Sequence, residues 1–350
     1  MASESTIAAG NPIPVNVITG FLGSGKTTLL QRLLRSPGMS RTVVLINELG
    51  EIGLDHLLVE RVDEALVLLQ NGCICCSIRD DLKSALRGLL SRRERKQIPA
   101  FDRVVIETTG LADPGPVLYT LLGEPVVRHS FRLGNVVTTV DALNADLHLS
   151  RNPEGVKQVA AADRLVITKT DLADAAQIAA VRDMLSRTNP SAEILDAAQI
   201  GFDADRVLVE QTRDLTPLTR FRPHVGEPEP AADSTRGLQH NASVASLSLA
   251  LDEPLDWTAF GIWLSLLLHR HGDNVLRVKG ILRVQDAAAP VFINAVQHIV
   301  HPPQHLERWP TADQRSRIVF ITRGIEHALL ARSLAAFSRN RVGAPTPEAA

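Results

Sequence analysis

The chain has 350 residues, of which 45% are hydrophobic and 22% charged, a length that suggests about two domains of ~150 residues. A net charge of -2 and an aromatic content of 4% argue against nucleic acid, whose binding surfaces need basic patches or stacking side chains. All three cysteines fall in the segment Gly72-Cys73-Ile74-Cys75-Cys76, which indicates thiols used for metal or redox chemistry in a reducing compartment.

The sequence gives no sign of export or of membrane insertion. Residues 1–14 lack the basic and apolar regions of a secretory signal. The longest strongly apolar run, residues 262–268, is too short to cross a bilayer. We therefore expect a cytoplasmic protein with neither a membrane nor a nucleic acid as its partner.

Strand and helix signals alternate through the first part of the chain. Helices are predicted at residues 27–34, from Ser77 onward, and from Asp113 and Pro114, which match a helix cap followed by a first-turn proline. Strands are predicted at residues 15–19, 42–46, 66–69, 104–106, 136–140 and 165–167. This alternation is typical of an α/β fold with a mainly parallel sheet and helices on both faces.

The composition changes near residue 220. Residues 220–242 are rich in proline, glycine and charge, which predicts an exposed linker. Strands are then predicted at 244–251, 275–284, 291–299 and 318–321, and helices at 257–268 and 325–337. We expect a nucleotide-binding domain at 1–219, a smaller C-terminal α+β domain at 243–342 and a disordered tail at 343–350.

A phosphate-binding loop follows the first predicted strand. Residues 20–27 match the pattern G-x-x-x-x-G-K-[ST] and run into a predicted helix, as the motif requires. Backbone N–H groups in such a loop cradle phosphate oxygens, the lysine approaches the β- and γ-phosphates, and the threonine hydroxyl binds magnesium. The residues expected to hold the nucleotide here are Gly20, Gly23, Ser24, Gly25, Lys26, Thr27 and Thr28.

A second motif indicates which base is bound. Thr168-Lys169-Thr170-Asp171 follows a predicted strand and resembles the Asn-Lys-x-Asp motif of GTPases, with threonine in place of asparagine. A carboxylate such as Asp171 accepts hydrogen bonds from guanine N1–H and its amine, whereas adenine has neither donor there. Lys169 is expected to lie along the base, and only the loop-bracing contact of the missing asparagine is in question.

The segment Glu107-Thr108-Thr109-Gly110 closes another predicted strand. We expect Glu107 to hold magnesium, together with Thr27, and the Gly110 N–H to contact the γ-phosphate. Lys26, Thr27, Glu107 and Gly110 are thus the expected catalytic residues. The sequence contains no obvious glutamine to orient the attacking water, so we expect slow hydrolysis that a partner accelerates.

The cysteine segment is suited to an exchangeable metal. Cys73, Cys75 and Cys76 supply three thiolates, whereas a structural zinc site normally has four protein ligands. Glu51 or Glu48 is a candidate fourth ligand, from the segment Asn47-Glu48-Leu49-Gly50-Glu51. A redox-reactive thiol cluster and a closed structural metal site are the alternatives.

These motifs together resemble the CobW family of GTPases, and the resemblance extends to Leu276-Arg277-Val278-Lys279-Gly280 and Ile318-Val319-Phe320-Ile321 in the second domain. The family implies a metallochaperone that uses GTP and magnesium to insert zinc, or another transition metal such as cobalt or iron, into a client metalloprotein. It also implies that the three cysteines hold the transferred metal, with Glu51 as an additional ligand. A GTPase regulator or assembly factor with a structural or redox-sensing thiol site is the alternative. The histidine-rich tract of many relatives is absent, since the linker has only His224 and His240.

Overall fold

A parallel sheet forms the centre of the first half of the molecule. The computed structural model describes residues 12–47, 66–69, 77–199, 204–208, 215, 218 and 244–338, and in them this sheet has seven strands in the order β3-β2-β4-β1-β5-β6-β7. Every described pairing between these strands is parallel. The strands are β1 (Ile13–Gly20), β2 (Thr42–Asn47), β3 (Leu66–Leu69), β4 (Arg103–Glu107), β5 (Phe131–Asp141), β6 (Arg164–Thr168) and β7 (Glu193–Asp196).

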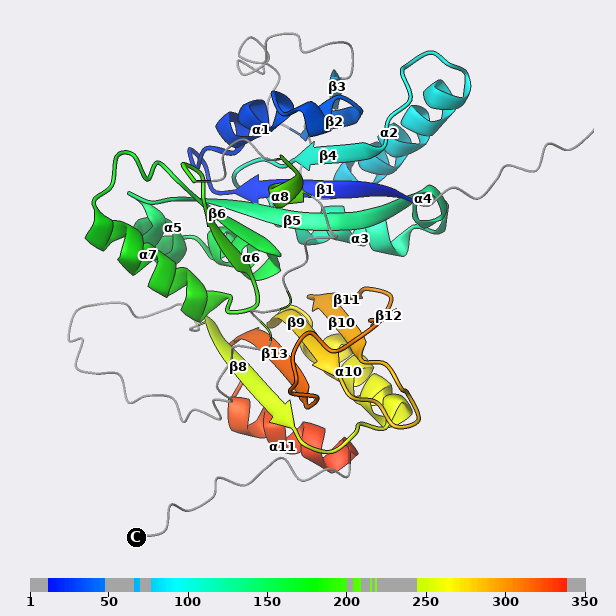
Figure 1. Cartoon of the computed structure of the whole chain (residues 1–350), viewed down its shortest axis with the longest axis vertical. Helices are drawn as coiled ribbons and strands as arrows, with labels where there is room; N and C mark the ends of the chain where they lie inside the picture. Colours follow the sequence, from blue (N-terminus) through cyan, green and yellow to red (C-terminus); the bar gives the residue numbers. More distant parts are fainter. Residues whose placement is uncertain are drawn as a thin grey trace, which may run out of the picture.

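Helices cover both faces of this sheet (Figure 1). They are α1 (Lys26–Leu34), the short 3-10 helix η1 (Pro37–Met39), α2 (Ser77–Glu94), α3 (Gly115–Gly123), α4 (Pro125–Ser130), α5 (Ala145–Arg151), α6 (Pro153–Ala161), α7 (Ala175–Thr188) and α8 (Ala204–Leu208). Neighbouring side chains of β4 point to opposite faces, so Val104 and Ile106 join the cluster of α2 and α3, while Val105 joins that of α1 and α8. The predicted α/β fold is therefore confirmed.

The second half contains a separate antiparallel sheet. Strand β9 is at its centre, between β10 and β13, and β8 pairs with β13 at one edge. Helices α10 and α11 pack on one face through a cluster that includes Trp263, Phe320 and Leu334. The elements are β8 (Val244–Leu251), α10 (Trp257–His271), β9 (Val275–Leu282), β10 (Val291–Val296), β11 (Ile299–Val300), β12 (Gln304–His305), β13 (Ser316–Arg323) and α11 (His327–Ser338).

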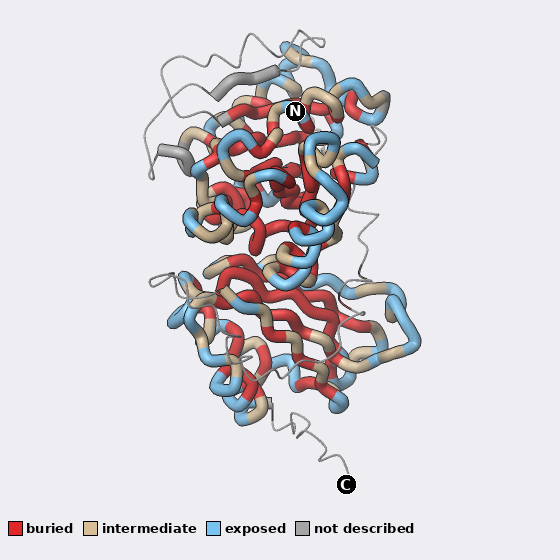
Figure 2. The backbone as a smooth tube through the Cα atoms, turned by 90° about the vertical axis from the view of Figure 1, so that its left-hand side faces the viewer, coloured by how far each residue is buried: buried red, intermediate tan, exposed pale blue. Residues whose placement is uncertain are grey.

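The other face of the second sheet packs against the first half of the molecule. Ile281, Phe292 and Val319 share a buried cluster with Ala160 of α6. Figure 1 shows α6 on the side of the parallel sheet that faces β9 and β13. Figure 2 accordingly shows buried backbone in both halves of the molecule. The second sheet is thus covered on both faces.

A group of buried charges also joins the two halves. Arg277 of β9, which is 0% exposed, donates to the Ala161 carbonyl and, at 2.5 Å, to Oδ1 of Asp163. The Lys279 ammonium lies 3.4 Å from the same carboxylate oxygen and 3.3 Å from the Ser191 carbonyl. Because a buried charge without a partner is strongly destabilising, these bonds favour one arrangement of the two halves.

The structure differs from the sequence prediction locally. Strands β7 and β12 were not predicted. The strand predicted at 291–299 is a hairpin, in which β10 ends at Val296 and β11 begins at Ile299, with Gln297 in a left-handed conformation at φ 51°. Tight hairpin turns favour glycine or asparagine, so Gln297 and His298 gave no turn signal. Helix α3 begins at Gly115, later than predicted, and the Asp113 carboxylate accepts the Gly115 N–H at 2.9 Å.

Several predictions concern residues outside the described ranges. These include the metal ligands Cys73, Cys75, Cys76 and Glu51, the alternative ligand Glu48, the linker at 220–242 and the tail at 343–350. The predicted domain boundaries lie there too. Among the described helices, none is long and apolar enough to cross a membrane.

Candidate functional site

The phosphate-binding loop connects β1 to α1 at the carboxyl edge of the parallel sheet. Gly20 has φ 142°, and a Cβ there would lie 2.3 Å from Oγ1 of Thr139, so the close approach to β5 requires glycine. Gly25, at φ 87° and ψ 21°, is the N-cap of α1 without a side-chain cap bond. Because glycine has no side chain, the N-cap residue does not bind the first-turn N–H groups of α1. These groups can therefore donate to an anion.

Three polar residues expected in the nucleotide site lie together around this loop. Lys26 is 9% exposed, and its ammonium donates to the carbonyls of Gly20 at 3.0 Å and Phe21 at 3.1 Å. The Thr27 hydroxyl donates to Oε1 of Glu107 at 2.7 Å, across 80 residues of sequence. A hydroxyl and a carboxylate are hard oxygen ligands of the kind magnesium prefers, so the residues present fit that ion.

The segment after Glu107 lies directly against the loop. Glu107 ends β4 and pairs in register with Ile18 of β1, just before β1 ends at Gly20. A Cβ on Gly110 would lie 2.6 Å from the Leu22 backbone nitrogen. Only glycine therefore fits at this position, where the segment contacts the phosphate-binding loop.

The guanine motif contacts the same loop. The Thr168 hydroxyl donates to the Ser24 carbonyl at 2.7 Å, so threonine makes a loop-bracing contact at the position where many GTPases have asparagine. Lys169, at φ 57°, donates from its ammonium to Oδ2 of Asp141 at 2.7 Å. Asp171 is exposed at the end of this motif.

Two carboxylates that the sequence prediction missed hold this region. Asp141, 1% exposed at the end of β5, would have its pKa raised by burial, but hydrogen bonds from Lys169, Asn144 and the Leu143 N–H lower that pKa overall. Asp196 ends β7 and accepts the Thr170 hydroxyl at 2.7 Å. Each is the last residue of a largely apolar strand. An acidic residue at the end of such a strand is the signal by which the sequence could have identified them.

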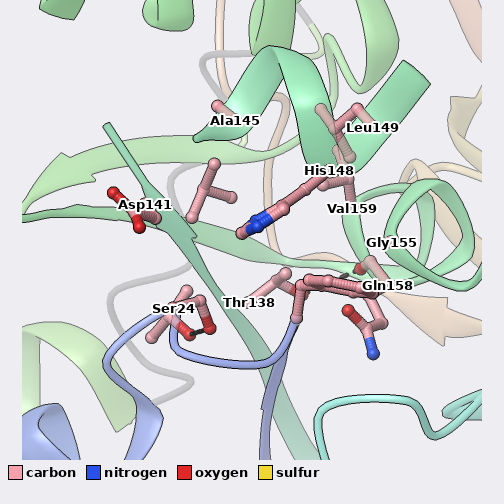
Figure 3. Close-up of a pocket in the computed structure, with 12 residues that line it drawn as sticks. Ser24, Thr138, Asp141, Ala145, His148, Leu149, Gly155, Gln158 and Val159 are labelled. Carbon is pink, nitrogen blue, oxygen red and sulfur yellow. Dashed lines mark hydrogen bonds between the residues drawn. The ribbon is translucent and has the colours of Figure 1, made fainter. Parts of the chain in front are cut away.

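A pocket lies beside the loop, between β5 and helices α5 and α6 (Figure 3). It is partly open to solvent, and Asp141 and Gln158 line it at different ends. The imidazole of His148 projects into it, with its ring centroid 4.5 Å from that of Phe21 in the loop. Burial lowers the pKa of His148, and the nearby Asp141 charge offsets part of that effect.

Known protein families match both halves of the chain. Residues 14–196 match the family described as the CobW/HypB/UreG nucleotide-binding domain. The chain belongs to this family. Residues 244–338 match the cobalamin synthesis protein cobW C-terminal domain, so both halves of a CobW-type GTPase are present.

Individual relatives agree with that membership. The chain is 32% identical over 311 residues to the zinc chaperone YjiA of Escherichia coli, an alignment that covers 89% of this chain and 94% of the relative. It is 37% identical over 193 residues to zinc-regulated GTPase metalloprotein activator 1 of Schizosaccharomyces pombe, covering 53% and 46% of the two chains. The crystal structure of Zn(II)-bound YjiA GTPase from E. coli matches with a TM-score of 0.68 at 27% identity, covering 94% and 99%. The resemblance seen in the sequence is therefore confirmed, and the protein is a CobW-type GTPase.

The described residues supply no complete transition-metal site. Within them, no three histidine, cysteine, aspartate or glutamate side chains are arranged to hold a metal ion. The predicted ligands Cys73, Cys75, Cys76 and Glu51 lie outside the described ranges. Their role is therefore a proposal from the sequence, taken up below.

Proposed function

We propose that this GTPase is a metallochaperone, which binds a transition metal at Cys73, Cys75 and Cys76 and transfers it to a client metalloprotein in the cytoplasm. Zinc is the preferred cargo, because relatives over much of the chain are named zinc chaperones. Glu51 is the proposed additional ligand. The observation that carries this proposal is the position of the Cys-x-Cys-Cys segment in the sequence. It lies between the end of β3, a strand of the nucleotide-binding sheet, and the start of α2.

The register of the sheet supports this coupling. In β3, Leu69 pairs with Asn47 of β2, and the neighbouring Ile46 pairs with Glu107 of β4. Leu69 and Glu107 are therefore separated by about two strand spacings, or ~10 Å. Along the sequence, Cys73 follows Leu69 by four residues, and Cys76 directly precedes Ser77, where α2 begins. This short separation between the strand that precedes the cysteines and Glu107 supports the proposed coupling between the thiols and the nucleotide.

The nucleotide roles belong to the same proposal. Gly20, Gly23, Ser24, Gly25, Lys26, Thr27 and Thr28 hold the phosphates of GTP. Thr27 and Glu107 hold magnesium, which neutralises phosphate charge when bound. Lys169 and Asp171 recognise guanine, and the Gly110 N–H contacts the γ-phosphate. The 2.7 Å bond between Thr27 and Glu107 supports the shared magnesium role, because it places the two oxygens near enough to contact one ion.

The proposed cycle links these two sites. GTP and magnesium contact the segment from Glu107 to Gly110 and the segment from Glu48 to Glu51, and these contacts set the geometry of the thiol segment. Hydrolysis releases them, one metal–thiolate contact weakens, and the metal passes to the client. A tenfold change in metal affinity needs only about 1.4 kcal/mol of coupling free energy.

Zinc titration of the metal-free, full-length protein tests this proposal. We expect one equivalent to bind, with a Kd that differs at least tenfold between GDP and a non-hydrolysable GTP analogue. The control changes all three cysteines to serine and should bind no zinc while retaining GTP hydrolysis. Equal zinc affinities in the two nucleotide states would refute the coupling.

Transfer is measured separately, with a chromogenic chelator of known zinc affinity as the acceptor. We expect zinc to move to the chelator faster after hydrolysis than in the presence of the GTP analogue. Zinc that stays bound in every nucleotide state would indicate a closed structural site. No bound zinc in either the wild type or the serine variant would instead favour redox sensing.

A further inference from the structure

Gln158 of α6 binds the segment that follows Glu107. Its amide nitrogen Nε2 donates to the carbonyl oxygens of Gly110 at 3.1 Å and of Ala112 at 3.0 Å. The side chain is 1% exposed and comes from a helix 48 residues further along the chain than Gly110. One buried amide therefore fixes two carbonyl groups of a short segment that contains a glycine.

The orientation of this amide follows from its neighbours. Both groups that it contacts are carbonyl oxygens, so only the nitrogen end can face them, and a flipped amide would bring three oxygens together. Within the described part of the chain, Oε1 of Gln158 has no hydrogen-bond partner. Leaving a buried amide oxygen unpaired is unfavourable, and an apolar side chain would fill this space without that penalty. The value of glutamine here thus lies in its two donated bonds.

The helix that carries Gln158 is itself held at its carboxyl end. Side chains from other elements bind all of its last carbonyl groups, which an isolated helix leaves without partners. Thr138 donates to the Gln158 carbonyl at 2.8 Å, and Arg277 of the second sheet donates to the Ala161 carbonyl. The amide of Asn189 donates to the carbonyls of Val159, Ala160 and Ala162 at 2.8, 3.2 and 3.0 Å.

The neighbouring residue of α6 adds a second contact to the same segment. The Lys157 ammonium lies 2.7 Å from Oδ2 of Asp113. Asp113 also accepts a hydrogen bond at 3.3 Å from Gln297, in the β10–β11 turn of the second sheet. Residues 110–113 are therefore held from one helix at three points, and that helix is anchored by both halves of the molecule.

We infer that Gln158 is a positioning residue for GTP hydrolysis, which fixes the backbone of Gly110 so that its N–H meets the γ-phosphate. Glycine has the greatest backbone freedom of any residue, and the close approach to Leu22 excludes a side chain that would restrict it. The bond to the Gly110 carbonyl supplies the restriction instead. Such preorganisation lowers the barrier because no reorientation is needed in the transition state. The inference rests on the proposed role of Gly110 but not on metal transfer.

Gln158→Met tests the inference, since methionine has a similar shape and no donor. Single-turnover GTP hydrolysis and nucleotide affinity are measured with magnesium as the only divalent metal, so a failure of the metal proposal would not affect the result. We expect the rate constant to fall at least 10-fold, while GDP affinity stays within about twofold. The preference for a non-hydrolysable GTP analogue over GDP should fall as well.

A matched control loses a buried bond far from the nucleotide. Ser316→Ala removes the hydroxyl that accepts the Arg283 N–H at 2.8 Å in the second sheet, and its hydrolysis rate should match the wild type. The inference is overturned if Gln158→Met hydrolyses GTP as fast as Ser316→Ala. It is equally overturned if GDP affinity falls as much as the rate constant, because that pattern indicates general damage to the site.

Gln158→Glu gives an independent readout, and it serves if the methionine variant does not fold. A protonated glutamic acid retains one donor for the two carbonyls, whereas the carboxylate retains none. Burial beside carbonyl oxygens favours the protonated form. The hydrolysis rate of this variant should therefore fall with rising pH more steeply than that of the wild type. Parallel pH profiles would contradict the inference.

Discussion

Replacing Arg277 with methionine should loosen the contact between the two halves of the molecule. The change removes the guanidinium that binds Asp163 at 2.5 Å and the Ala161 carbonyl, and it leaves a buried carboxylate 7% exposed. Removing one partner of a buried ion pair costs about 3–5 kcal/mol of unfolding free energy. We expect about 3 kcal/mol, the low end of that range, since Lys279 remains 3.4 Å from the same oxygen.

Asp163→Asn should be the more destabilising of the two changes. It removes the carboxylate that Arg277 and Lys279 both contact, while an amide oxygen can still accept the Val136 N–H that Asp163 Oδ2 binds at 3.1 Å. We expect about 5 kcal/mol, the upper end of the range for a broken buried pair. The predicted order of the two variants follows from the number of charged contacts that each one removes, which is two for Asp163→Asn and one for Arg277→Met.

Urea unfolding with two probes measures both changes. All three tryptophans, Trp257, Trp263 and Trp309, lie in the second half of the chain, and Trp309 packs against the cluster between the halves. Fluorescence thus reports the second half, while circular dichroism reports both. In the variants the fluorescence transition should move to lower urea than the circular dichroism transition.

Two results would refute this reasoning. One is a loss below about 1 kcal/mol in both variants, with coincident transitions, which would mean that the charges contribute little to docking. The other is a larger loss for Arg277→Met than for Asp163→Asn, which would mean that the shared carboxylate of Asp163 is not the dominant contribution.

Three further changes test the nucleotide site. Gly110→Ala should lower the rate of single-turnover GTP hydrolysis at least 10-fold, because the new Cβ would lie 2.6 Å from a backbone nitrogen of the phosphate-binding loop. The control is Gly88→Ala in α2, whose Cβ would have no neighbouring atom within 4 Å and which should hydrolyse GTP at the wild-type rate. Thr168→Val removes the 2.7 Å bond to the Ser24 carbonyl, which costs about 1–3 kcal/mol. We expect the affinities for fluorescent GDP and GTP analogues to fall equally, by about 10-fold. A change in affinity for one nucleotide alone would contradict this prediction. Asp141→Asn should destabilise the protein at neutral pH and progressively less in acid. The pKa of Asp141 is lowered on folding, so its stabilisation is present above the unfolded pKa of about 4 and is lost as the pH falls through the folded value. A difference in unfolding free energy that does not shrink as the pH is lowered below about 4 would contradict this.

Contiguous motifs were predictable from the sequence. The phosphate-binding loop identifies itself through glycines and a lysine at fixed spacing, and the strands before and after it are apolar runs. The predicted strands at 42–46 and 66–69 match β2 and β3 to within one residue. Local patterns of this kind carry enough information because the chemistry lies within a few neighbouring residues.

Residues whose role depends on tertiary contacts were not predictable in the same way. Gln158 lies in an ordinary helical pattern, and nothing nearby in the sequence links it to Gly110, 48 residues away. Asp141 and Asp196 are single acidic residues at strand ends, and their partners come from a different loop. At Thr168 the sequence motif has threonine in place of asparagine, which put the loop-bracing contact in question. In the structure the threonine hydroxyl nevertheless contacts the loop.

Helix α6 has a consequence for how a bound protein would affect nucleotide binding. Its Gln158 amide binds the segment beside the nucleotide, and its Ala161 carbonyl binds Arg277 of the second sheet. Thermodynamic linkage is reciprocal, so any factor by which GTP changes binding at the second sheet must equally change GTP binding once that surface is engaged. A protein that binds the second half of the molecule more tightly in one nucleotide state would therefore change the preference for GTP over GDP by the same factor, without touching the phosphates.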